Sequence, residues 1–420
     1  MKDIFKSLKI DDSQKIINNF FNEVKSSINI KGLVGSGLTF RLAWSYNSNP
    51  RNILFIAESI ELAQFYLNDL ETFIPENNIY FFPSSFNSIK NVEDINNDNL
   101  LIRNEVLSKK KDKKKIIITY PEAVSEKIIS KKIIENKTQK ISIGDKLSIE
   151  FINEILFEYE FERVDYVARP GEFSVRGGII DVFSFSNQYP YRIEFYDEII
   201  ESLRTFNVES QLSIRNYNTI YVSPNIGKLF FNNYHSDSLI KSLPSDNICV
   251  IENLDALIHT IEKSHTNFKI KELDDKTKNI FVSKNEIIED LNTNSFISLS
   301  NNDFLKTNSN LKIQQSPQPS FNKKFDLIIN YLKVNSKNNI KNIICASTEE
   351  QGKRLENVFE QYKQKLSYDI IYYPIYQGFE DQKLKIAILT DHQIFDRYFK
   401  YRSRSKFKKN EALTLGEISD

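Results

Sequence analysis

Ten residues near the N-terminus, KGLVGSGLTF at 31–40, nearly match a phosphate-binding loop. The pattern G-x-x-x-x-G-K-[ST] is met at Gly32, Gly37 and Thr39, but Leu38 stands where the lysine is required. In a working loop the backbone N–H groups cradle the phosphates, the lysine supplies positive charge and the Ser/Thr hydroxyl holds Mg²⁺. Because Leu38 carries no charge, the sequence favours a loop that is retained for its shape.

Nucleotide hydrolysis is the alternative reading of this loop. Hydrolysis also requires an acidic partner for the metal and a residue that positions water, but no D-E-x-[HD] sequence follows a buried strand. Asp181 falls in a predicted antiparallel β region, where we expect it to serve the fold. We therefore expect no catalytic residue and a degenerate nucleotide loop, with Thr39 as a helix cap. The loop comprises Gly32, Gly35, Ser36, Gly37, Leu38 and Thr39.

A second group of residues whose types could carry a function lies at 164–213. It combines glycines, Arg176, Arg192 and several aromatic residues on short predicted strands. Arginine and aromatic side chains are concentrated at the hot spots of protein interfaces. The segment is therefore a candidate protein-binding surface. The alternative is a simple turn at the Arg-Gly-Gly sequence with the aromatic residues in the core.

The elements around the glycine loop follow an α/β pattern. Apolar strands are predicted within 28–31, 51–59, 78–85 and 114–122, and they alternate with segments of helical periodicity. Continuously apolar strands that alternate with helices indicate a parallel sheet covered by helices. The glycine loop then lies where a strand of this sheet passes into a helix.

The pattern changes after a predicted helix at 147–159. Residues 171–185 and 189–207 alternate polar and apolar side chains, which is typical of antiparallel strands with one buried face. We expect 219–224 and 246–263 to return to the first sheet. Residues 270–320 are rich in Asn, Ser and Lys and are weakly patterned, and residues 300–320 are predicted to be a loop or linker before a further α/β block.

The sequence GEFSVRGGIIDVF…PYRIEFYDEIIESLRTF closely resembles the bacterial transcription-repair coupling factors (Mfd), and more distantly the excision-repair protein UvrB. A weaker segment at 388–406 resembles the end of the third domain of the coupling factors. The chain departs from UvrB in having GSGLT in place of GSGKT and in lacking a Tyr-rich hairpin between 81 and 106. Both departures fit the UvrB-like N-terminal half of a coupling factor.

The resemblance implies an adaptor that recruits UvrA to RNA polymerase stalled at DNA damage, in transcription-coupled nucleotide excision repair. It places UvrA contacts at Arg176, Arg192, Glu194 and Tyr196. Side chains at 192, 194 and 196 share one face of a strand, so Ile193 and Phe195 are expected to point inward and Tyr191 to be core.

The resemblance also implies what the full-length relatives add. They contain an RNA-polymerase-interaction domain and an ATP-driven translocase on double-stranded DNA, which binds ATP and Mg²⁺. No motor motif is found in this chain, which we expect to stop before the polymerase-interaction domain and to have no cofactor of its own. A P-loop ATPase with an unusual loop and a divergent UvrB are the alternatives.

The predicted fold class is α/β: a degenerate P-loop, RecA-like parallel-sheet domain with an inserted small α+β domain, followed by a further small α/β domain. The predicted limits are 1–144 and 213–300 for the two parts of the first domain, 145–212 for the UvrA-binding insert, 301–395 for the third domain and 396–420 for a basic linker.

Composition adds only broad limits. Lys+Arg and Asp+Glu both number 56, so no net charge draws the chain to nucleic acid or membrane. Cys249 and Cys345 lie in apolar runs and are expected to be buried thiols, and the four histidines lack the spacing of a metal site. With no signal peptide or apolar run of membrane-spanning length, we expect a cytoplasmic monomer.

Overall fold

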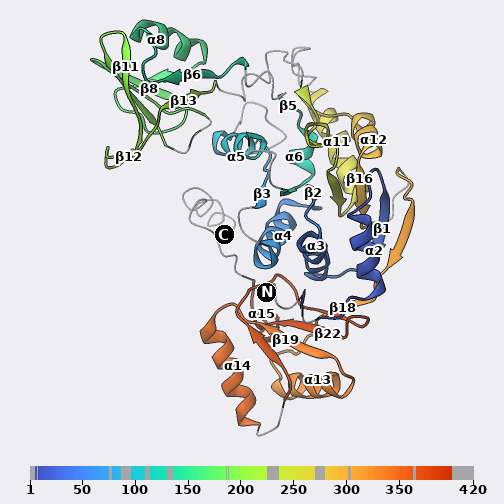
Figure 1. Ribbon diagram of the computed structural model, residues 1–420. Helices are drawn as coiled ribbons and strands as arrows, with labels where there is room; N and C mark the ends of the chain where they lie inside the picture. The colour runs from blue at the N-terminus through green and yellow to red at the C-terminus, as the bar shows by residue number, and fades with distance from the viewer. Residues whose placement is uncertain are drawn as a thin grey trace.

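The computed structural model contains three blocks, which are distinguished by position and colour in Figure 1. The central block carries a seven-stranded sheet, the insert block is the green unit at the upper left, and the C-terminal block is the orange and red unit at the bottom. The structure describes residues 5–6, 8–74, 78–86, 96–108, 114–129, 136–185, 187, 189–224, 236–269, 280–300, 304–362 and 366–399.

The sheet of the central block is parallel at every pairing. Its strands, from one edge to the other, are β17 (Ser309–Lys312), β1 (Ser27–Lys31), β16 (Ser295–Ser298), β15 (Ile248–Ile251), β2 (Ile53–Ile56), β4 (Ile116–Thr119) and β3 (Ile79–Phe81). The four residues of β2, β4, β15 and β16 are all buried, as expected for strands covered on both faces.

Helices flank this sheet and begin at recognisable capping residues. The Ser59 side chain accepts a hydrogen bond from the Leu62 amide at the start of α4, and Ser283 and Glu286 form a capping box at the start of α12. The helices are α2 (Asp12–Phe20), α3 (Gly37–Ser48), α4 (Ile60–Phe73), α5 (Asn97–Ser108), α6 (Pro121–Ser125), α10 (Leu239–Ser242), α11 (Leu254–Lys269) and α12 (Lys284–Thr293). A short antiparallel pair joins β5 (Ile128–Ile129) to β14 (Ser236–Asp237).

The insert block is built on a six-stranded sheet. Its order is β12 (Ser213–Asn216), β11 (Ile199–Phe206), β10 (Tyr191–Tyr196), β9 (Ile179–Val182), β8 (Glu172–Arg176) and β7 (Glu162–Arg163). One face packs on α8 (Ile149–Glu158) and on the pair β6 (Gln139–Ser142) and β13 (Thr219–Val222), where Phe173, Ile180 and Ile193 lie in the core. The opposite face carries polar side chains, among them Asp181 and Arg192.

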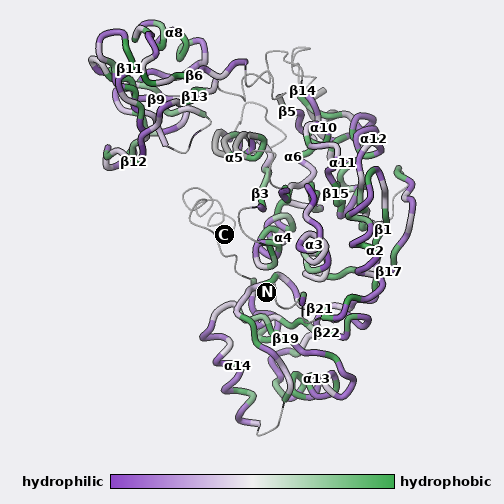
Figure 2. Tube along the Cα trace, in the orientation of Figure 1, coloured by the Kyte–Doolittle hydropathy of each residue, from purple (hydrophilic) through white to green (hydrophobic). Residues whose placement is uncertain are grey.

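The C-terminal block has a mixed five-stranded sheet. Its order is β18 (Gln315–Pro317), β21 (Phe379–Asp381), β22 (Ile386–Thr390), β19 (Lys341–Cys345) and β20 (Asp369–Ile371). It is accompanied by α13 (Phe325–Lys337), α14 (Glu349–Gln361) and α15 (Asp391–Ile394). Figure 2 shows that α14 is hydrophilic along much of its length, and only Gly352, Leu355 and Phe359 of this helix are buried.

The predicted fold class is confirmed: the chain is α/β, with a parallel-sheet unit and smaller sheets arranged as expected. Two local expectations are wrong. β13 pairs with β6 instead of returning to the parallel sheet, because Ile220 and Val222 complete the core of the insert block. The predicted linker at 300–320 contains β17 and β18, since the buried apolar residues Leu311 and Ile313 outweigh its polar composition. The domain limits stay a prediction.

The composition also led to expectations about the two cysteines, membrane-spanning segments and metal sites. Cys249 and Cys345 are buried free thiols, as expected. Within the described ranges, no helix has the length and apolar character to cross a bilayer, and no group of three or more His, Cys, Asp or Glu side chains could hold a metal ion. The basic segment predicted at 396–420 lies mostly outside the described residues, which end at Phe399.

Candidate functional site

The glycine loop connects β1 to α3, as the sequence predicts. β1 ends at Lys31 and α3 begins at Gly37, with Ser36 as its N-cap residue. Gly32 and Gly35 have positive φ angles of 82° and 51°, which L side chains rarely adopt. The backbone therefore turns between strand and helix in the manner of a phosphate-binding loop, and glycine is required for that turn.

The C-terminal block engages this loop directly. The Ser36 amide donates to the Gln377 carbonyl over 3.3 Å, and the Gln377 amide donates to Ser36 Oγ over 3.0 Å. The Val34 amide donates to Gln315 Oε1 over 3.2 Å. Backbone groups that would face phosphates in a working loop are thus bonded to a protein segment.

The three loop glycines are also sites of close approach. A Cβ atom on Gly32 would lie 2.1 Å from the Ile313 carbonyl oxygen, and one on Gly37 would lie 2.2 Å from Gln315 Oε1. A Cβ atom on Gly35 would lie 2.8 Å from the Cβ of Gln377. The spacing of glycines in KGLVGSG therefore matches the surface of residues 313–315 and 377.

Thr39 and Leu38 both lie in the interior. Leu38 is 5% exposed and belongs to the apolar core of the central block. Thr39 Oγ1 lies 2.9 Å from the Ser36 carbonyl oxygen and 3.1 Å from Asp69 Oδ2. The expectation that Thr39 caps the helix is wrong: it is the third residue of α3, one turn past Ser36.

Asp69 joins the two blocks from the central side. Its Oδ1 accepts a hydrogen bond from the Tyr376 amide over 2.7 Å. Burial raises the pKa of the Asp69 carboxyl to about 7, against which the hydrogen bonds from Ser36, Tyr376 and Thr39 act. A carboxyl group that titrates near neutral pH thus lies inside this contact.

A buried arginine makes the second polar tie between the blocks. Arg41 on α3 is 1% exposed, and its guanidinium contacts Asp381 Oδ2 at 2.7 Å and Asp11 Oδ1 at 2.6 Å. Gln315 Nε2 donates to the same Asp381 oxygen over 2.9 Å. Because Asp381 is fully buried, removal of Arg41 would leave its carboxylate without a charged partner, whereas Arg41 would keep Asp11 if Asp381 were removed.

Sequence reasoning missed one acidic residue of the central sheet. Glu252 directly follows β15, the kind of position at which a P-loop enzyme places its metal-binding acid. Its carboxylate accepts the Tyr66 hydroxyl and, over 2.8 Å, the Glu58 amide, and burial raises its pKa. The signal was an acid at the end of the buried run ICVIE. The Tyr66 hydroxyl and the Glu58 amide therefore already bond the Glu252 carboxylate.

The predicted binding residues of the insert block do share one face of its sheet. Arg192 and Glu194 of β10 lie on the side away from the core, whereas Ile193 is buried within it. Tyr196 is 73% exposed and follows a bulge after Glu194, while Phe195 packs against the core. Tyr191 is 9% exposed, so its assignment to the core is confirmed.

One buried carboxylate lies between the two predicted arginines. Asp181 of β9 is 1% exposed; its Oδ1 contacts Arg192 Nε at 2.7 Å and its Oδ2 contacts Arg192 Nη2 at 2.8 Å. Asp181 Oδ2 also accepts a hydrogen bond from Arg176 Nη2. The register explains this arrangement, because Asp181 is directly opposite Arg192 on the neighbouring strand.

A second ion pair lies beside this group. Glu194 is bonded by Arg204 and by the hydroxyl of Ser202, both on β11. The Arg204 hydrogen bond is the main cause that lowers the pKa of Glu194 to about 2. We call the resulting surface the arginine face. It consists of Arg176, Asp181, Arg192, Glu194, Tyr196 and Arg204.

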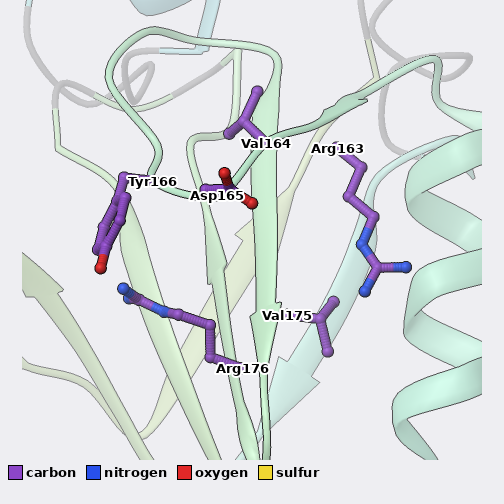
Figure 3. A pocket seen from close by; sticks show the side chains of 6 residues that line it. All are labelled: Arg163, Val164, Asp165, Tyr166, Val175 and Arg176. Carbon is purple, nitrogen blue, oxygen red and sulfur yellow. The ribbon is translucent and has the colours of Figure 1, made fainter.

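The structure adds an aromatic residue that the sequence did not single out. Tyr166 is 67% exposed, and the Arg176 guanidinium carbon lies 4.8 Å from the centre of its ring. Figure 3 shows the two side chains facing each other at the edge of an open pocket, with Arg163 on the opposite side. Its position in a connecting segment, outside the strand alternation, explains why sequence reasoning missed it.

Comparison with known proteins agrees with this geometry. A family described as the UvrB interaction domain matches residues 140–227, which contain the arginine face. A transcription-repair-coupling factor of Bacillus subtilis is 26% identical over 215 residues, covering 51% of this chain and 18% of the relative. One of Rickettsia bellii is 33% identical over 181 residues, covering 42% of this chain and 16% of the relative. The matched segments thus span less than a fifth of these relatives.

Proposed function

We propose, from the premise that this chain is related to the transcription-repair coupling factors, that it is an adaptor that binds UvrA through the arginine face. In this function it recruits UvrA to RNA polymerase stalled at DNA damage, as part of transcription-coupled nucleotide excision repair in the cytoplasm. RNA polymerase and double-stranded DNA are partners of the complete coupling factor, which is an ATP-driven translocase. The chain itself acts as a monomer without cofactor.

The observation that carries the proposal is the paired arginine cluster on the face of the sheet opposite its apolar core. Arg176 and Arg192 are held within one hydrogen-bonded group, the exposed Tyr166 ring lies beside Arg176, and Tyr196 is exposed at the end of β10. Fixed arginines beside exposed aromatic rings are the side chains that contribute most at protein interfaces. Acidic side chains on UvrA are the expected partners of this face.

We further propose that the glycine loop serves as a docking surface for the C-terminal block instead of a nucleotide. The hydrogen bonds of Ser36 and Val34 to Gln377 and Gln315 support this role. The burial of Leu38 supports it as well, because a lysine at that position would be withdrawn from solvent. The central block then positions the insert block and carries no catalysis.

The adaptor function is tested by measuring the affinity of purified UvrA for variants of this chain. Arg176→Ala is the sharper probe, because its side chain is 38% exposed and Asp181 keeps Arg192 as a partner. We expect the variant to weaken UvrA binding by about tenfold or more, as for other charged interface residues. Arg354→Ala on α14 is the matched control, since it changes the same residue type on another block.

The double variant Arg176→Ala/Arg192→Ala decides the assignment of the face. Its thermal midpoint must be compared with that of the native chain, because Asp181 then loses both partners. A folded double variant that binds UvrA with native affinity would exclude the arginine face as the binding surface.

A further inference from the structure

We infer that Asp181 is a positioning residue for partner binding: it fixes the guanidinium groups of Arg176 and Arg192 at one spacing before a partner arrives. This inference rests on the proposed function and deepens it, because it explains how the arginine face is prepared. Asp181 itself is 1% exposed and does not reach the surface that a partner would touch.

The geometry gives Asp181 contact with both arginines at once. Its side chain bonds the Nε and Nη2 atoms of Arg192 through separate oxygens, and Oδ2 is shared with Nη2 of Arg176. β9 lies between β8 and β10 in the sheet, so Asp181 is directly opposite Arg192 on one side and diagonal to Arg176 on the other. A single carboxylate on the middle strand is therefore the group that both arginine side chains have in common.

The pairing leaves positive charge and hydrogen-bond donors for a partner. Two guanidinium groups on one carboxylate retain one net positive charge. Arg192 Nη1, Arg176 Nε and Arg176 Nη1 have no hydrogen-bond partner among the residues that the structure describes. Planar guanidinium forks that keep free N–H groups suit carboxylate groups, which accept such bonds in pairs. The chemistry fits an acidic segment of the partner.

Aromatic rings complete the fixation of each arginine. The Arg192 guanidinium carbon lies 4.2 Å from the ring centre of the buried Phe206, and Arg192 Nη2 also donates to Gln211 Oε1 over 2.9 Å. Arg176 has the Tyr166 ring on one side. Side chains that are ordered in the free protein lose less conformational entropy on binding, so affinity is gained without a new contact.

The test compares Asp181→Asn with the native chain in UvrA binding and in NMR of the arginine Nε–Hε groups. We expect Asp181→Asn to raise the dissociation constant for UvrA by about tenfold or more. We also expect Arg176→Ala to cost much less in the Asp181→Asn background than in the native one, because the two residues act together. Asp145→Asn is the control: this carboxylate accepts the Ser142 amide at the turn after β6.

The NMR arm needs no variant and covers the case in which Asp181→Asn fails to fold. In the free native chain the Arg192 Nε–Hε resonance should be present and slow to exchange, since Nε donates to buried Asp181. Rapid exchange of that group would overturn the inference, and so would a folded Asp181→Asn variant with native affinity or fully additive losses with Arg176→Ala. If the native chain does not bind UvrA while the resonance is protected, the proposed function fails and the positioning of the arginines stands.

Discussion

Ser36 and Gln377 exchange two hydrogen bonds, one through each backbone amide, although 341 positions separate them in the chain. Ser36 begins the helix of a loop that resembles a nucleotide site, and Gln377 precedes β21 of the C-terminal block. The pair holds the C-terminal block against the central block, and the residues around it determine how this contact responds to ligand, mutation and pH.

Magnesium-ATP at millimolar concentration should leave the thermal midpoint of the chain unchanged. The loop amides are bonded to the protein, and Leu38 supplies no charge to the phosphates. A ligand present at a hundred times its dissociation constant would stabilise a protein by about 2.7 kcal/mol. Differential scanning calorimetry with and without Mg-ATP checks this. A rise of several degrees would restore the ATPase alternative.

Leu38→Lys should not create nucleotide binding and should destabilise the central block. Leu38 is 5% exposed within the apolar core, so the ammonium group would be desolvated without a partner. We expect a loss of roughly 2–4 kcal/mol in the free energy of unfolding, comparable with other buried polar groups that lack partners. Leu38→Met, which conserves volume, should cost less than about 1.5 kcal/mol. Equal stability of the Lys and Met variants, measured by urea unfolding, would contradict the burial of Leu38.

Gly32→Ala should cost more stability than Gly144→Ala. Both glycines have similar positive φ angles, 82° and 85°, so both alanines share a backbone strain of about 1–2 kcal/mol. Only Gly32 is approached by another backbone: its added Cβ would lie 2.1 Å from the Ile313 carbonyl oxygen, whereas nothing lies within 4 Å at Gly144. Chemical unfolding of the two variants measures the difference. A loss at Gly32 no larger than at Gly144 would show that the approach of residue 313 does not constrain the loop.

The contact around Asp69 should weaken as pH rises through neutrality. The ordinary pKa of 3.8 is raised to about 7 by burial, so the folded state retains a proton that the unfolded state has released. The stabilisation by the protonated carboxyl is complete below about pH 4 and is lost as pH passes 7, with a total on the order of a few kcal/mol. Asp69→Asn, which cannot ionise, should remove this dependence and be more stable than the native chain at pH 8.

The measurement is the unfolding free energy of both proteins between pH 5 and 8.5. His392, which bonds the Tyr376 carbonyl, has a pKa lowered by burial and therefore loses stabilisation in the opposite direction, as pH falls below about 6.5. Since His392 is common to both chains, its contribution cancels in their difference. A difference that does not change with pH would exclude a buried, protonatable Asp69.

The sequence alone determined those features that depend on local periodicity. The period of two along β10 places residues 192, 194 and 196 on one face, because successive side chains of a strand point to opposite sides. The order of strand β1, glycine turn and helix α3 could likewise be predicted, since glycine permits the positive φ angles of the turn. The absence of lysine at position 38 was visible without any coordinates.

Tertiary structure decided what those features contact. The sequence predicted only that Asp181 serves the fold. The register of β9 against β10 and the side-chain contacts show that it bonds two arginines. The sequence predicted a degenerate nucleotide site at the glycine loop. Only the tertiary structure shows that the Val34 amide of this loop bonds Gln315, which is 281 positions away in the chain. Such pairings depend on strand register and on the docking of blocks, which no local pattern records, because the partners meet only after the chain has folded.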